Sequence, residues 1–91
     1  MPDVLKVFEQ ARRTQADFLK IDLDTALILA DRARSAEHPE DRDRNRRNAR
    51  RAYDTVLSFL ANATVGEPDT HEINTRLERV RSELQSLGED V

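Results

Sequence analysis

Hydrophobic residues recur along this chain every three or four positions, which is the spacing of one face of an α-helix. No segment alternates apolar and polar residues in the way that a half-buried strand does. The pattern predicts helices over residues 4–20, 23–37, 39–62 and 70–87. Because the connections between them are short, we expect a single all-α domain over residues 1–91, a small bundle of four antiparallel helices.

The boundary between the first two predicted helices rests on a change in the phase of the apolar stripe. Before the boundary the stripe passes through Val4, Phe8, Ala11, Gln15 and Phe18. After it the stripe passes through Leu23, Ala26, Leu27, Ala30 and Ala33. The change of phase, with Asp22 as a capping residue, predicts a tight turn at Asp22. Residues 20–24 contain neither glycine nor proline, so a continuous helix, and a bundle of three, is the alternative.

Prolines and glycines mark the other helix ends. Pro39 disfavours helix in the residue before it and suits the first helical position, so the third helix is expected to begin there. The segment 66–70, Gly-Glu-Pro-Asp-Thr, is the clearest break in the chain. Gly88 stands where a glycine commonly follows a helix, and the residues after it are expected to fray.

The last predicted helix carries apolar residues in alternating steps of four and three, at Ile73, Leu77, Val80, Leu84 and Leu87. This heptad spacing either forms a dimer interface or completes the core of the monomer. The residues expected to be buried together are Leu27, Ala30, Ala52, Val56, Leu60, Leu77, Val80 and Leu84. Ile28 lies nearly opposite the stripe of its own helix, which indicates a second buried side or an interface.

Composition limits the core and favours self-association. Only 37% of the 91 residues are hydrophobic and 4% are aromatic, so the core must be small, aliphatic and rich in alanine. A chain of this size gains stability when a partner buries apolar surface, so we expect a homodimer or another protein partner. There is no cysteine, no apolar signal region and no apolar run near the roughly 20 residues of a membrane span, so we expect a cytoplasmic protein without membrane contact.

Two short motifs resemble metal sites without completing them. Residues 41–45, Asp-x-Asp-x-Asn, match the opening of an EF-hand loop, but Arg46 and Ala52 replace its glycine and glutamate. His71-Glu72 begins a zinc-protease motif whose second histidine is replaced by Thr75. With no phosphate-binding glycine loop and no nucleophile motif either, the sequence predicts no metal, no cofactor and no catalytic residue.

The third predicted helix carries a cluster of six arginines, Arg42, Arg44, Arg46, Arg47, Arg50 and Arg51. One interpretation is a phosphate-binding helix that contacts nucleic acid. The favoured interpretation is a solvated face with one-turn ion pairs, of which Glu40–Arg44, Asp43–Arg47 and Arg50–Asp54 are examples. The net charge of −3 also gives the chain no electrostatic bias towards nucleic acid.

Polar residues interrupt the inner face of the same helix. At 100° per residue Asn45 falls at the centre of the stripe formed by Ala49, Ala52, Val56 and Phe59. Asn48 and Arg42 fall at its edges, and Tyr53 lies at its margin. The favoured interpretation is that the core ends before these residues, and the alternative is a polar pocket or a buried hydrogen-bonded pair.

Residues Asp22–Leu27 with Ala30 and Ala33, followed by Ala49, Tyr53 and Val56-Leu57, resemble the paired helices of tetratricopeptide-repeat proteins. The resemblance covers only Asp22 to Leu60, lacks the Trp-x-x-Leu-Gly signature of the repeat, and implies a partner-binding helical scaffold. Taken together, the sequence favours a non-enzymatic protein-interaction or structural module that self-associates. A nucleic-acid-associated regulator that uses the arginine-rich helix is the alternative.

Overall fold

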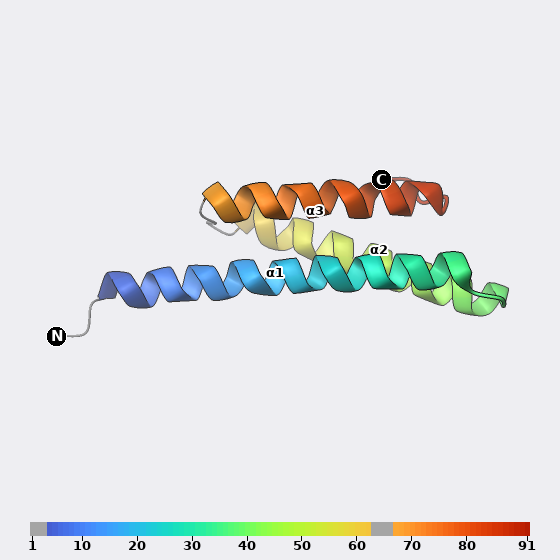
Figure 1. The fold of residues 1–91 in the computed structure, drawn as a ribbon, viewed down its shortest axis with the longest axis horizontal. Helices are drawn as coiled ribbons and strands as arrows, with labels where there is room; N and C mark the ends of the chain where they lie inside the picture. Colours follow the sequence, from blue (N-terminus) through green and yellow to red (C-terminus); the bar gives the residue numbers. More distant parts are fainter. Residues whose placement is uncertain (1–3, 63–66) are drawn as a thin grey trace.

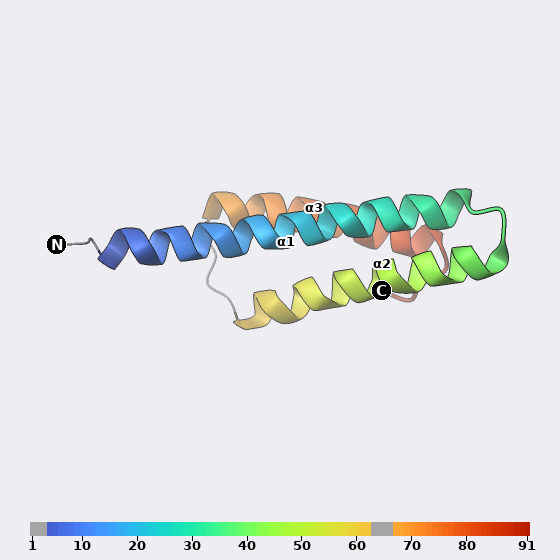
Figure 2. The same ribbon diagram turned by 90° about the horizontal axis from the view of Figure 1, so that it is seen from below.

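Three long helices lie side by side in the computed structural model, which describes residues 4–62 and 67–91. They are α1 (Val4–Ser35), α2 (Pro39–Asn62) and α3 (Glu67–Ser86). Neighbours along the chain run antiparallel, so α1 and α3 point the same way (Figures 1 and 2). The molecule measures 58 × 18 × 17 Å, and both α2 and α3 pack mainly against α1. The all-α prediction is confirmed for the described residues, with three helices in place of four.

The turn predicted at Asp22 is wrong, because residues 20–24 lie inside the continuous helix α1. Leu19 and Leu23 are buried on one side of α1, whereas Phe18 and Ile21 are exposed on another. The change of phase in the sequence therefore records two apolar stripes on one helix. With no glycine or proline to interrupt the backbone hydrogen bonds, nothing ends the helix at Asp22.

The apolar stripe that the sequence shows at the start of α1 is exposed. Val4, Phe8 and Phe18 keep 61%, 59% and 64% of their surface in contact with solvent. The first buried residue of α1 is Ala16, and the turns before it project beyond the ends of α2 and α3 (Figures 1 and 2). An amphipathic pattern shows that a face is apolar, but only the neighbouring helices decide whether it is covered.

Helix α2 begins at Pro39 and ends at Asn62, as its sequence predicts. The missing N–H of Pro39 costs nothing at the first helical position, and the next turn closes with the Arg42 N–H donating to the His38 carbonyl at 3.1 Å. Glu40 and Asp41 lie in the first turn, where negative charge complements the helix dipole.

Small residues allow close packing between the two long antiparallel helices. Ala26 and Ala30 of α1 and Ala49 of α2 have no exposed surface. The core contains Ala16, Leu19, Leu23, Ala26, Ala30, Ala49, Tyr53, Val56, Ile73, Leu77, Val80 and Leu84. Five of the expected core residues are confirmed as buried, and the other three, Leu27, Ala52 and Leu60, are half-buried against them.

The heptad stripe of α3 completes the core of the monomer. Ile73, Val80 and Leu84 are fully buried and Leu77 is 8% exposed, so this stripe is not free to form a dimer interface. The helix begins at Glu67, earlier than the expected residue 70. Proline is tolerated in a first turn, where the backbone N–H groups have no partner within the helix, and so Pro68 does not delay the start. Gly66 of the expected break lies outside the described residues.

Gly88 ends α3 with a Schellman motif. Its φ of 92° lies in the left-handed region, which favours glycine. The Gly88 N–H donates to the Gln85 carbonyl and the Glu89 N–H donates to the Leu84 carbonyl, both at 3.0 Å. The fraying expected after Gly88 is wrong, because this motif turns the chain back and Val91 packs against the core.

Candidate interaction surfaces

Ion pairs fix α3 against α1. The Lys20 ammonium lies 2.8 Å from the Asp69 carboxylate and 2.6 Å from that of Glu72, near the start of α3. The hydrogen bonds that Lys20 donates to the Asp69 and Glu72 carboxylates raise the pKa of Lys20, and the bond to Glu72 lowers the pKa of Glu72. Lys20 and Glu72 therefore both stay charged over a wider pH range than they would in the unfolded chain.

Further ion pairs join the same two helices. Arg76 lies 3.7 Å from Asp24, and Arg34 donates to both Glu83 and Ser86. Because Arg34 and Glu83 belong to different helices, they fix the lengthwise position of α3 on α1. Exposed pairs of this kind add little free energy, so their contribution is to orientation.

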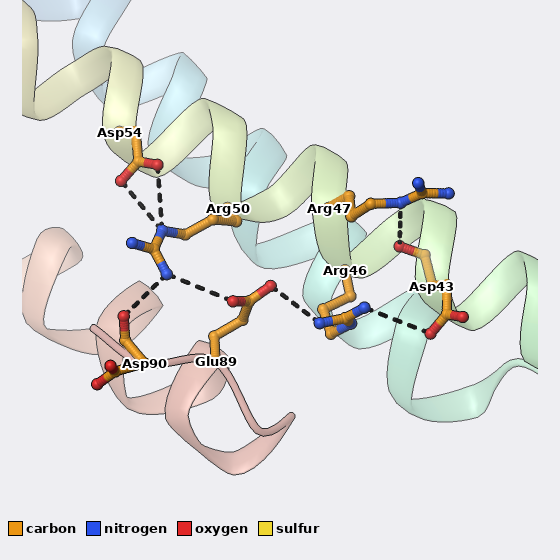
Figure 3. Close-up of polar contacts among 7 residues, drawn as sticks. All are labelled: Asp43, Arg46, Arg47, Arg50, Asp54, Glu89 and Asp90. Carbon is orange, nitrogen blue, oxygen red and sulfur yellow. Dashed lines mark hydrogen bonds and ion pairs between the residues drawn. The ribbon is translucent and has the colours of Figure 1, made fainter.

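Glu89 joins the arginine-rich helix to the end of the chain (Figure 3). Its two carboxylate oxygens accept hydrogen bonds from Arg46 at 3.2 Å and Arg50 at 3.3 Å. Arg50 also binds the Asp54 carboxylate through Nε at 3.1 Å and donates to the Asp90 carbonyl at 3.0 Å. The Glu89 side chain is only 16% exposed. Two of the six clustered arginines are thus occupied within the monomer.

The remaining arginines are divided between local partners and solvent. Arg44 pairs with Asp41 at 2.7 Å, and Arg47 donates to the Asp43 backbone oxygen at 3.3 Å. Of the expected one-turn pairs only Arg50–Asp54 is confirmed, because Arg44 takes Asp41 in place of Glu40, and the Asp43 carboxylate binds Arg46 in place of Arg47. Arg42 and Arg51 are exposed. Nearby acids therefore pair with three of the six arginines, Arg44, Arg46 and Arg50.

Neither Asn45 nor Asn48, the candidates for a polar pocket or a buried pair, is buried. Asn45 is half-buried, and Asn48 and Arg42 are exposed. In the described part of the chain no polar side chain is buried, and no buried side-chain nitrogen or oxygen lacks a hydrogen bond. Tyr53 belongs to the core at 8% exposure, not to the margin of the stripe. The core ends before the asparagines, which supports the favoured interpretation.

The second apolar stripe of α1, which we call the α1 seam, is exposed along its whole length. Its positions follow alternating steps of three and four residues, and they are Val4, Val7, Ala11, Thr14, Phe18, Ile21, Thr25 and Ile28. All eight are exposed, and the five large side chains retain between 54% and 64% of their surface. Ile28, the candidate contact residue, is one of them. The seam was not predicted as a unit, because the stripe predicted at the start of the chain passes through Val4, Phe8, Ala11, Gln15 and Phe18 and ends at the predicted turn.

A shallow apolar groove lies beside the middle of the seam. Its volume is about 220 Å³, and it lies between Phe18 of α1 and Phe59 of α2, with Leu19, Gln15 and Asp22 as the other lining residues. Phe59 was expected on the buried stripe of α2, but it is 52% exposed. The exposed apolar surface therefore continues from α1 onto the end of α2.

The described residues form no cluster of side chains that could hold a metal ion. No three metal-binding side chains gather anywhere in residues 4–62 and 67–91, where His38 and His71 are both exposed. The helices of that part are all too short or too polar to cross a membrane. The chain matches no known family model, no curated protein and no solved structure.

Proposed function

We propose that this protein is a non-enzymatic interaction module that binds a partner helix along the α1 seam, and that it self-associates through this face. The observation that carries the proposal is the exposure of all eight heptad positions from Val4 to Ile28. Coiled-coil partners bury residues with this spacing, because alternating steps of three and four keep the side chains on one face. The resemblance of residues 22–60 to tetratricopeptide helix pairs, which also implies partner binding, stays a prediction.

The N-terminal turns of α1 give a physical reason for a partner. Residues 4–15 include no buried side chain, so the core of the monomer does not support this part of the helix. Short isolated helices are marginal in water, and helices in proteins owe most of their stability to a packed apolar face. A second helix along the seam would supply that packing.

We expect Ile28→Asp to weaken dimerisation by at least about tenfold, because burying an isoleucine contributes roughly 1.5–3 kcal/mol and about 1.4 kcal/mol equals a factor of ten in affinity. The matched control is Leu57→Asp, which makes the same kind of change at an exposed residue of α2 outside the seam. Sedimentation equilibrium over a range of concentrations measures both dissociation constants. A wild-type chain that stays monomeric at high micromolar concentration, or equal effects of the two variants, would contradict the proposal.

Nucleic-acid binding by α2 is the alternative, and we expect it to be negligible at physiological salt. Glu89 and Asp54 neutralise Arg46 and Arg50, and acids interleaved along the helix repel phosphate. A salt titration with duplex DNA and single-stranded RNA tests this, with Arg47→Ala and Glu89→Gln as paired variants. Submicromolar binding that weakens with salt, falls in Arg47→Ala and rises in Glu89→Gln would favour the alternative.

A further inference from the structure

We propose that the occupant of the α1 seam is the seam of a second copy of this chain, running antiparallel, with Ala11 opposite the partner's Ile21 and Thr14 opposite the partner's Phe18. The inference rests on the proposed function and adds to it the identity and direction of the partner helix. It follows from the sizes of the seam residues, the charges that flank them, and the groove beside Phe18.

The order of large and small residues along the seam favours the antiparallel direction. A parallel homodimer places each residue against its own copy, so Ala11 would meet alanine while Phe18 would meet phenylalanine. The spacing between the helices would then have to change from one layer to the next. The antiparallel register instead gives every layer one larger and one smaller side chain, in the pairs Val4–Ile28, Val7–Thr25, Ala11–Ile21 and Thr14–Phe18. Evenly filled layers avoid the cavities that destabilise a packed interface.

The acidic residues beside the seam also favour the antiparallel direction. Asp17, Asp22 and Asp24 occupy flanking heptad positions, where charges set the partner and the orientation. In a parallel dimer Asp17 faces the partner's Asp22 on both sides of the interface. In the antiparallel register Asp24 lies near the partner's Gln10 and Asp22 near the partner's Phe8. Of the described flanking acids only Asp17 meets its own copy. Among the described residues the antiparallel direction therefore carries one like-charge contact, whereas the parallel direction carries two.

Two features of the monomer fit this arrangement. The Thr25 hydroxyl already donates to the Ile21 carbonyl at 2.9 Å, so it can enter an apolar layer without an unsatisfied donor. The twofold axis would pass between the two Thr14–Phe18 layers, next to the groove formed with Phe59. Each α1 would then cover the groove of its partner, which accounts for the continuation of the apolar surface onto α2.

Thiol cross-linking measures the direction, because the chain contains no cysteine of its own. One chain carries Ala11→Cys and a size-tagged chain carries Ile21→Cys, and a short bis-maleimide joins thiols that lie opposite each other. We expect the mixture to give the cross-linked heterodimer and each variant alone to give little product. Asp17→Cys leaves every seam residue intact and is expected to cross-link to its own copy.

Other outcomes separate this inference from the proposed function. Self-cross-linking of Ala11→Cys and of Ile21→Cys, without the heterodimer, would show a parallel dimer and overturn the direction only. In another outcome, Ile28→Asp disrupts the wild-type dimer, but neither the Ala11–Ile21 nor the Asp17–Asp17 cross-link forms. That outcome would overturn the register and leave the docking role of the seam intact. A monomeric wild-type chain in sedimentation would overturn both proposals.

Discussion

Leu23→Ala is expected to lower the free energy of unfolding by about 2–5 kcal/mol, the usual cost of truncating a fully buried leucine. Leu23 has no exposed surface and lies in the core that α1 shares with α2 and α3. The surrounding helices are held in place by each other, so they cannot collapse fully into the cavity that the variant leaves. Against a total stability of roughly 5–15 kcal/mol for a typical domain, this loss is large. Urea unfolding followed by circular dichroism at several protein concentrations measures it.

Ile21→Ala is the matched control for this prediction, two residues earlier on the same helix. Ile21 is 61% exposed, so at concentrations where the protein is monomeric we expect a change within about 0.5 kcal/mol. At higher concentrations the same variant should lose stability relative to wild type, because dimerisation stabilises only folded chains whose seam is intact. Equal losses for Leu23→Ala and Ile21→Ala in the monomer would contradict the assignment of the buried stripe.

Asp22→Pro is expected to cost about 3 kcal/mol or more, because Asp22 lies in the interior of α1. Proline there removes the backbone hydrogen bond to the carbonyl of Phe18, four residues earlier, and its ring collides with that carbonyl. The resulting kink would also displace the Lys20 contacts with α3. Thermal unfolding and the helical circular dichroism signal measure the loss.

Asp22→Ala separates the backbone effect from the loss of the carboxylate. In a continuous helix alanine is the better helix former, so we expect stability to stay equal or rise slightly. At a helix start, by contrast, losing an Asp cap would cost about 1 kcal/mol and proline would be tolerated nearby. If Asp22→Pro were tolerated and Asp22→Ala were destabilising, the result would show a helix start at Asp22 and would support the turn that the phase change predicted.

The contacts of the arginine cluster could be predicted only in part. Arg50–Asp54 lies one turn apart on one helix, so its geometry follows from helical spacing alone. Glu89 was not predicted as the partner of Arg46 and Arg50, from which it is separated by 43 and 39 residues. The available signal was Gly88, since a Schellman motif fixes the direction of the next residue, but the identity of the neighbouring helix is a tertiary property.

Local sequence determined the helical content of this protein, the start of α2 and the end of α3. Pro39 can occupy only the first turn of a helix without cost, and Gly88 adopts a φ that other residues avoid, so both boundaries follow from backbone sterics. The buried stripe of α3 also follows from sequence, because its helix has only one apolar face.

Only the tertiary structure decided which face of α1 is buried. Two stripes on that helix satisfy the same helical spacing, and the chain alone does not say which one α2 and α3 cover. Small residues at Ala26, Ala30 and Ala33 permit the closer approach, and the pairs from Lys20 and Arg34 fix α3 along the same side. Helices α2 and α3 both pack against the buried side of α1. Neither helix reaches the opposite side, so the α1 seam stays exposed.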